Sequence, residues 1–227
     1  MKKTTETVEC GGKMHVSNND TELVFIIDRS GSMGGFEADT IGGFNSMIEN
    51  QKKSANGVVY VTTALFDNNS EILHDRVPIN NVRPMTEEDY TVGGCTALLD
   101  AIGDEVHHIT NIHKYARPDD VPKHTVFVIT TDGMENASCK YSTRSIKDMI
   151  KRKTEKYGWE FIFVAANIDA IKTAGSIGIR KERAAGYRQT RGGFVDCYCA
   201  MSDFISAKRA GTMTDEDTCW KKRLEEE

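Results

Sequence analysis

The chain has 227 residues, 39% of them hydrophobic, and 29 basic against 34 acidic residues give it a net charge of −5. This length and composition are typical of one globular domain that buries its own core without disulfides. The acidic balance argues against a nucleic-acid partner. No apolar run reaches the roughly 18 residues of a membrane span. No apolar stretch follows the N-terminal lysines, so we also expect no secretory signal.

Six cysteines are scattered along the chain: Cys10, Cys95, Cys139, Cys197, Cys199 and Cys219. Without an export signal we expect them to be reduced thiols in a cytoplasmic protein. Only Cys197 and Cys199 lie close together in sequence. They fall on a predicted helix, where residues two apart point in different directions, and no second pair matches them. We therefore interpret them as thiols in or near the core, not as half of a soft-metal site.

The chain divides into three parts. Residues 1–20 are polar and aperiodic, which predicts an N-terminal arm. Residues 21–210 form the body. Residues 211–227 are mostly charged and predict a solvated tail, although its Cys219 and Trp220 are unusual there and would be able to pack back onto the body.

Strand and helix patterns alternate along the body. Apolar and β-branched runs predict strands at 22–28, 57–67, 70–79, 124–132, 159–167 and 184–187. Periodic spacing predicts helices at 35–54, from Thr96 through Ile109, at 142–157, at 171–179 and at 194–210. A hairpin turn at 67–69 makes the third strand antiparallel to the second. The alternation predicts an α/β fold: a doubly wound, mainly parallel six-stranded sheet with one antiparallel edge strand and helices on both faces.

Three polar segments are expected at one edge of this sheet. Residues 28–33 follow the first strand, residues 132–133 follow the fourth strand, and residues 93–96 precede a helix. Ligands of open α/β sheets bind beyond the carboxyl ends of the strands. Carboxylate and hydroxyl oxygens are hard ligands, which suit Mg²⁺ or Mn²⁺ better than Zn²⁺. The candidate metal ligands are therefore Asp28, Ser30, Ser32, Thr96 and Asp132.

The motif D-x-S-x-S at 28–32, the threonine after Gly93-Gly94 and the aspartate at 132 resemble the von Willebrand factor type A (vWA) domain, in its stand-alone bacterial or phage type. The resemblance covers about residues 21–210. In that family these five positions form the metal-ion-dependent adhesion site (MIDAS). The resemblance implies that Ser30, Ser32 and Thr96 coordinate the ion, and that Asp28 and Asp132 hold it directly or through water. It also implies the strand order 3-2-1-4-5-6.

We therefore expect a protein-interaction module without enzymatic activity. Its Mg²⁺, with Mn²⁺ or Ca²⁺ as alternatives, would bind an acidic side chain of a partner protein. We further expect a cytoplasmic monomer that binds neither membranes nor nucleic acid. A simpler interpretation has Ser30 and Ser32 capping a helix and Asp28 closing a turn. Capping does not account for Thr96 and Asp132 together.

Two other functions stay open. One is a Mg²⁺-dependent phosphoester hydrolase or phosphotransferase that uses the same site. Phosphatases with an aspartate nucleophile carry a second aspartate two residues later, where this chain has Ser30, and the sequence contains neither G-x-S-x-G nor a Walker loop. The other is a scaffold whose ion site is unused and whose arm or tail forms the interface.

The remaining polar residues near this edge have structural interpretations. Asp67 and Asp169 end strands, which favours a turn and a helix cap. Arg29 is expected to point to solvent, with contact to an acidic ligand beside the metal as the alternative. His107, His108 and His113 lie on or just after the helix that follows Thr96, and we expect His108 to be solvated and not to be a metal ligand.

Overall fold

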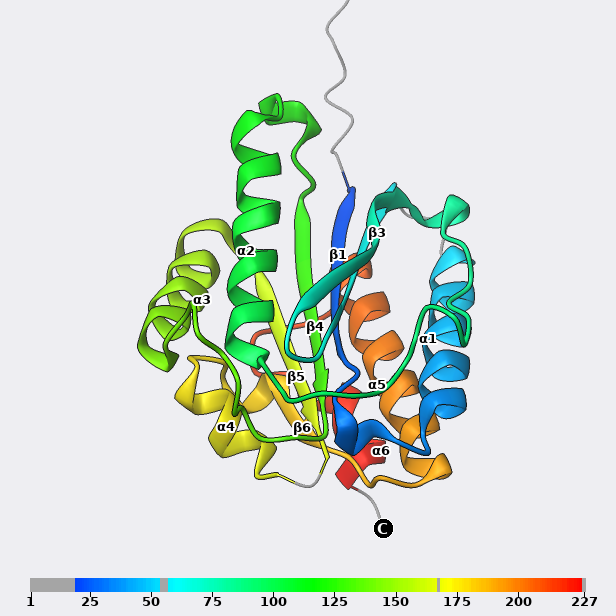
Figure 1. Ribbon diagram of the computed structural model, residues 1–227. Coiled ribbons are helices and arrows are strands. Elements are labelled where there is room, and N and C mark those ends of the chain that lie inside the picture. Colours follow the sequence, from blue (N-terminus) through cyan, green and yellow to red (C-terminus); the bar gives the residue numbers. More distant parts are fainter. Residues whose placement is uncertain (1–18, 54–56, 167, 226–227) are drawn as a thin grey trace, which may run out of the picture.

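The computed structural model describes residues 19–53, 57–166 and 168–225, so most of the expected arm, including Cys10, lies outside the described residues (Figure 1). The strands are β1 (Thr21–Asp28), β2 (Val59–Phe66), β3 (Ser70–Pro78), β4 (His124–Thr131), β5 (Glu160–Ala165) and β6 (Ala184–Gly186). The helices are α1 (Glu37–Lys52), α2 (Leu98–Tyr115), α3 (Thr143–Tyr157), α4 (Ala170–Ser176), α5 (Arg191–Ala210) and α6 (Lys222–Glu225).

The six strands form one sheet in the order β3-β2-β1-β4-β5-β6. Only β2 and β3 pair antiparallel, and the other neighbours are parallel. Helices α2, α3 and α4 cover one face, while α1 and α5 cover the other (Figure 1). All eight residues of β1 are buried, which explains its continuous apolar run. The predicted fold class, with its antiparallel edge strand and two helical layers, is confirmed.

Side-chain caps set several helix boundaries. The Ser142 and Ser145 side chains form a reciprocal capping box at the start of α3. Helix α5 begins at Arg191, three residues before the predicted start at 194, because Thr190 Oγ1 accepts a hydrogen bond from the Gly193 backbone N–H (3.1 Å). The first turn of α5 has two glycines and no apolar residue before Phe194, so hydrophobic periodicity could not reveal it. This start places the loop after β6 close to the carboxyl edge of the sheet.

The segment after α5 packs against the body. Trp220 is 4% exposed, and its ring meets Phe204 of α5 edge to face at 5.5 Å. Its Nε1 donates to the Glu182 carbonyl (3.1 Å), and Arg183 donates to the carbonyl oxygens of Thr214 and Asp217 (both 3.1 Å). Cys219, in contrast, is exposed. The structure therefore supports the packing of Trp220 onto the body, which the sequence had left open.

The described cysteines are all free thiols, with Cys197 buried and Cys199 half-buried on α5. This confirms the interpretation of that pair as core or near-core thiols. Across the described ranges, no helix combines the length and the apolar character that crossing a membrane requires.

Glu105 is a buried carboxyl on α2, 2% exposed, whose Oε2 has no hydrogen-bond partner within the described residues. Burial raises its pKa from the usual 4.5 to about 7, while nearby His108 opposes the shift. Because the folded protein holds this proton more tightly than the unfolded chain does, the protonated carboxyl favours the folded state at low pH. That stability is lost as the pH rises from 4.5 through 7. Glu105→Gln cannot ionise at this position. Between pH 5 and pH 8 the free energy of unfolding of this variant should therefore rise by about 2 kcal/mol relative to that of the wild type.

Urea unfolding at several pH values measures this gain. The same substitution at the exposed Glu88 serves as the control and should show no such trend. A difference between Glu105→Gln and the wild type that does not change with pH would contradict the assignment.

Candidate metal centre

Asp28 anchors the site at the carboxyl end of β1. Its Oδ1 accepts a hydrogen bond from the Ser30 backbone N–H (2.7 Å), and its Oδ2 accepts one from Thr131 Oγ1 (2.5 Å). Burial raises the pKa of the Asp28 carboxyl above its usual value, and these hydrogen bonds oppose the rise. Because both oxygens are already engaged, Asp28 fixes the start of the following loop against the end of β4.

The two serines of this loop lie side by side. Ser30 Oγ is 3.2 Å from Ser32 Oγ, and Ser32 Oγ donates to Asp132 Oδ1 (2.5 Å). Ser30 precedes a single 3₁₀ turn at Gly31–Met33, but its side chain makes no capping hydrogen bond. The α1 helix likewise has no side-chain cap. Capping therefore does not explain these hydroxyls.

Backbone contacts bring Thr96 to the same edge. The Gly31 N–H donates to the Gly94 carbonyl (3.2 Å), and the Thr96 N–H donates to Asn136 Oδ1 (2.8 Å). Gly94 has a φ of +74°, and a Cβ there would lie 2.2 Å from Asn68 Oδ1. Only glycine fits this position without strain. Helix α2 begins at Leu98, two residues after the predicted Thr96, so Thr96 belongs to the preceding loop.

The three hydroxyls converge on one small space beside Gly133. A Cβ built on Gly133 would lie 2.9 Å from Thr96 Oγ1, 3.3 Å from Ser32 Oγ and 3.8 Å from Ser30 Oγ. The structure thus brings all five predicted residues together, since Asp132 directly precedes Gly133 and Asp28 holds the Ser30 loop. Hydroxyl and carboxylate oxygens of this kind fit Mg²⁺ or Mn²⁺.

The donor set depends on serine and threonine. In the part of the chain that the structure describes, no three His, Cys, Asp or Glu side chains gather closely enough to hold a metal. Burial raises the pKa of the Asp132 carboxyl, while hydrogen bonds from Ser32 and Gln189 lower it. A cation at this place would therefore be held mainly by neutral oxygens and would keep much of its positive charge.

Gln189 is a site residue that the sequence analysis missed. It lies between β6 and α5, and its Nε2 donates to Asp132 Oδ2 (2.6 Å) and to the Ser32 carbonyl (3.2 Å). A single glutamine in a loop has no spacing signal that would have revealed it. Because Thr190, the next residue, caps α5, this contact joins the site to the start of the last long helix.

We expect Gln189→Ala to strengthen Mn²⁺ binding about threefold to tenfold. The Gln189 amide competes with a cation for Asp132 Oδ2, and one such hydrogen bond contributes about 1 kcal/mol. Calorimetric titration with Mn²⁺ measures the change. Weaker binding by the variant would contradict this expectation and would instead make Gln189 a ligand through its Oε1.

Arg29 does not point to solvent as predicted. Its side chain is 12% exposed, with Nε 3.1 Å from Asp67 Oδ2 and NH1 2.9 Å from Glu71 Oε2. Asp67 Oδ1 also accepts the Asn69 backbone N–H (3.0 Å), as expected for a turn. The Asp67 carboxylate of this turn therefore forms an ion pair with Arg29 of the D-x-S-x-S motif. The two residues are far apart in sequence, so local sequence does not show this pairing.

The other candidate side chains have structural partners. Asp169 caps α4 by accepting the Lys172 N–H (3.0 Å), which confirms its interpretation as a helix cap. His108 Nε2 lies 2.8 Å from Asp75 Oδ1 of β3, and His107 Nδ1 lies 2.8 Å from the Tyr141 hydroxyl. His113 Nε2 lies 3.3 Å from Glu22 Oε2. None of these contacts is at the candidate metal centre.

No family model matches the chain, and no curated protein sequence matches it. Solved structures do resemble it. The vWF domain of the type V pili tip protein Mfa5 from Porphyromonas gingivalis has a TM-score of 0.56 and 9% identity, covering 87% of this chain and 98% of that one. Proximal thread matrix protein 1 from the mussel byssus, with a zinc occupied MIDAS motif, has a TM-score of 0.56 and 12% identity.

The mussel match covers 82% of this chain and 46% of that chain. A von Willebrand factor type A structure from Catenulispora acidiphila has a TM-score of 0.53 and 11% identity, covering 85% of this chain and 43% of that one. This chain therefore spans less than half the length of the mussel and Catenulispora proteins. Identities this low establish the fold alone: the chain has the fold of von Willebrand factor type A domains.

Proposed function

We propose that this chain is a protein-interaction module that depends on a divalent cation, held by Asp28, Ser30, Ser32, Thr96 and Asp132. The observation that carries the proposal is the convergence of three hydroxyls, from two separate loops, beside Gly133 and Asp132. The zinc occupied MIDAS motif of the mussel protein supports divalent metal binding by this fold. Mg²⁺ is the proposed ion because the oxygens are hard, with Mn²⁺ or Ca²⁺ as alternatives.

When bound, the ion would supply a positive centre with a coordination position for a carboxylate of the partner. Neutral oxygens would come from Ser30, Ser32 and Thr96, and these do not compensate the positive charge of the ion. Asp28 would orient the serine loop through its bond to the Ser30 N–H. Asp132, held by Ser32 and Gln189, would add the second carboxylate, directly or through water. This arrangement favours an aspartate or glutamate side chain of a partner protein.

We further propose a cytoplasmic monomer without enzymatic activity. The free thiols among the described residues support a reducing compartment. Ser30, at the position where an aspartate-nucleophile phosphatase has its second aspartate, contacts Ser32 Oγ at 3.2 Å. This contact supports a ligand role and gives no support to the hydrolase alternative.

Selection from a display library of random peptides in Mg²⁺, followed by release with EDTA, tests the function. We expect the released peptides to share an Asp or Glu whose replacement by Asn or Gln abolishes binding. Thr96→Val is the matched variant, because it removes one hydroxyl from a buried side chain of nearly the same shape. Peptide binding that persists in EDTA or in Thr96→Val would contradict the proposal. Turnover of a generic phosphoester that is lost in Asp28→Ala would favour the hydrolase.

A further inference from the structure

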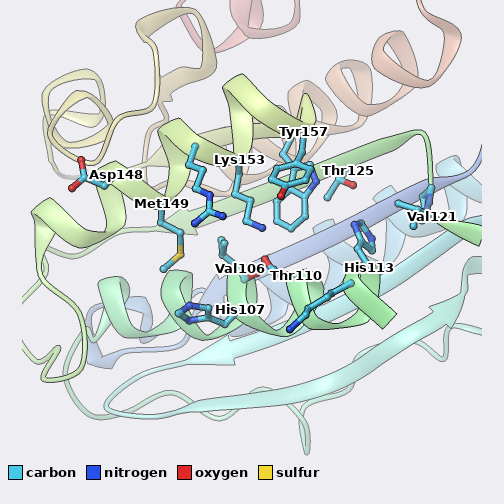
Figure 2. A pocket seen from close by; sticks show the side chains of 14 residues that line it. Val106, His107, Thr110, His113, Val121, Thr125, Asp148, Met149, Lys153 and Tyr157 are labelled. Atoms are coloured by element: carbon cyan, nitrogen blue, oxygen red, sulfur yellow. Dashed lines mark hydrogen bonds between the residues drawn. The ribbon is translucent and has the colours of Figure 1, made fainter. Parts of the chain in front are cut away.

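A second hollow lies far from the candidate metal centre. It is a cavity of about 830 Å³ between α2 and α3, above the start of β4 (Figure 2). Thr125, which lines it, lies at the amino end of β4, and Val121 lies just before that strand, whereas Asp132 follows its carboxyl end. Small-molecule sites in proteins commonly enclose about 300–1,000 Å³, so the cavity has the size of such a site.

The wall of this cavity contains a buried cation. Lys153 of α3 is 8% exposed, and its Nζ lies 4.5 Å from the Trp159 ring centre and 4.8 Å from the Tyr157 ring centre. Figure 2 shows its amino group pointing from α3 into the space that Thr110 of α2 borders. No acidic side chain in the described ranges forms an ion pair with it, and its amino group lies over the two aromatic rings.

A buried ammonium without a counter-ion is costly. Burial lowers the pKa of Lys153, because removing its charge from water disfavours the protonated form. The two ring faces offset part of this cost through cation–π attraction. Basic residues near a helix C-terminus often only complement the helix dipole, but those residues are usually exposed to water. An anion in the cavity would give Lys153 the counter-charge that the described residues do not provide.

The rest of the lining points to the same class of ligand. Lys114 and Arg152 add two more cations, against the single carboxylate of Asp148. Between these charges the surface is apolar and partly aromatic, with Val106, Met149 and Trp159 facing the space. Apolar walls with a few convergent charges are typical of sites for small amphiphilic molecules.

We propose that the cavity between α2 and α3 binds a small organic anion with a flat aromatic body, its anionic group on Lys153 and its ring against Trp159 and Met149. The proposal does not depend on the candidate metal centre. It concerns a different edge of the sheet and other side chains.

Calorimetric titration with 2-naphthoate, with the neutral 2-naphthamide as the matched compound, tests the proposal. We expect naphthoate to bind the wild type, and the amide to bind about tenfold or more weakly. Lys153→Met, which keeps the length of the side chain and removes its charge, should weaken naphthoate binding about ten- to a hundredfold, the range for hydrogen bonds to charged groups. Naphthoate affinity should be the same in Mg²⁺ and in EDTA, which separates this test from that of the proposed function.

Two further variants keep the test decisive. Lys151→Met removes a lysine of the same helix whose side chain is 65% exposed, and it should bind naphthoate like the wild type. Lys153→Arg restores the charge and should recover most of the binding even if Lys153→Met is less stable. Absence of naphthoate binding to the wild type would overturn the proposal. Equal binding of acid and amide, or unchanged binding by Lys153→Met, would also overturn it.

Discussion

Gly133→Ala is expected to abolish the stabilisation of this protein by Mg²⁺ or Mn²⁺. The new Cβ would lie 2.9 Å from Thr96 Oγ1 and 3.3 Å from Ser32 Oγ, within the space that a cation between these oxygens needs. Gly133 is not among the glycines with positive φ, so its backbone accepts alanine. The substitution therefore removes the space for the ion and keeps all five proposed ligand residues, although the Thr96 hydroxyl must shift to admit the new Cβ.

The expected size of the effect makes it measurable. An ion at a hundred times its dissociation constant stabilises a protein by about 2.7 kcal/mol. For a chain of this length that corresponds to a rise of about 5–10 °C in the unfolding midpoint. Thermal unfolding of wild type and variant in EDTA, in Mg²⁺ and in Mn²⁺ measures it. We expect the rise in the wild type and no rise in Gly133→Ala or Asp132→Ala.

Gly42→Ala is the matched control, because Gly42 lies in α1 and a Cβ there would meet nothing within 4 Å. This variant should keep the full response to metal. If Gly133→Ala also keeps it, the ion is not bound between Thr96 and Ser32. If the wild type shows no rise, the site does not hold an ion in the absence of a partner.

The sequence predicted what local pattern and sheet geometry determine. The run at 22–28 is apolar because β1 is buried on both faces between β2 and β4. Once the parallel strands were recognised, their carboxyl ends had to share one edge, which brought the residues after β1 and β4 together. The D-x-S-x-S spacing and the position of Thr96 were read from the sequence and carried the resemblance to the family. These are the parts of the site whose signal lies within short segments.

What the sequence did not reveal depends on contacts between distant segments. Gln189 reaches Asp132 across 57 positions, and Gln51 reaches Ser202 across 151 positions. Lys153 is buried because its amino group lies over the rings of Trp159 and Tyr157, although its own helix is rich in exposed charges. The charge of the tail predicted solvation, and the packing of Trp220, which the sequence left open, depends on Phe204 and the Glu182 carbonyl. Sequence periodicity does not show such contacts, because the sequence around each partner has an ordinary pattern of polar and apolar residues.

Glu160→Ala is expected to destabilise the fold by about 3–5 kcal/mol, the cost of removing one partner from a buried ion pair. Glu160 begins β5, and its Oε2 accepts a hydrogen bond from Arg183 Nε (3.0 Å) while its Oε1 accepts one from Lys208 Nζ (2.7 Å). The Arg183 side chain is only 3% exposed, so the variant would leave its guanidinium buried without a carboxylate. Urea unfolding, followed by circular dichroism, measures the loss.

Glu155→Ala is the control, since the Glu155 side chain is 67% exposed and lies 3.9 Å from Lys151. Exposed pairs of this kind contribute about 0–1 kcal/mol, so little change is expected. Glu160→Ala should also loosen the C-terminal segment, because the same Arg183 holds the carbonyl oxygens of Thr214 and Asp217. In a Trp159→Phe background, where Trp220 is the remaining tryptophan, its fluorescence should then shift toward longer wavelength. A loss below about 1 kcal/mol would mean that the Thr214 and Asp217 carbonyls satisfy Arg183 without Glu160, and that the Glu160–Arg183 pair contributes no more than an exposed pair.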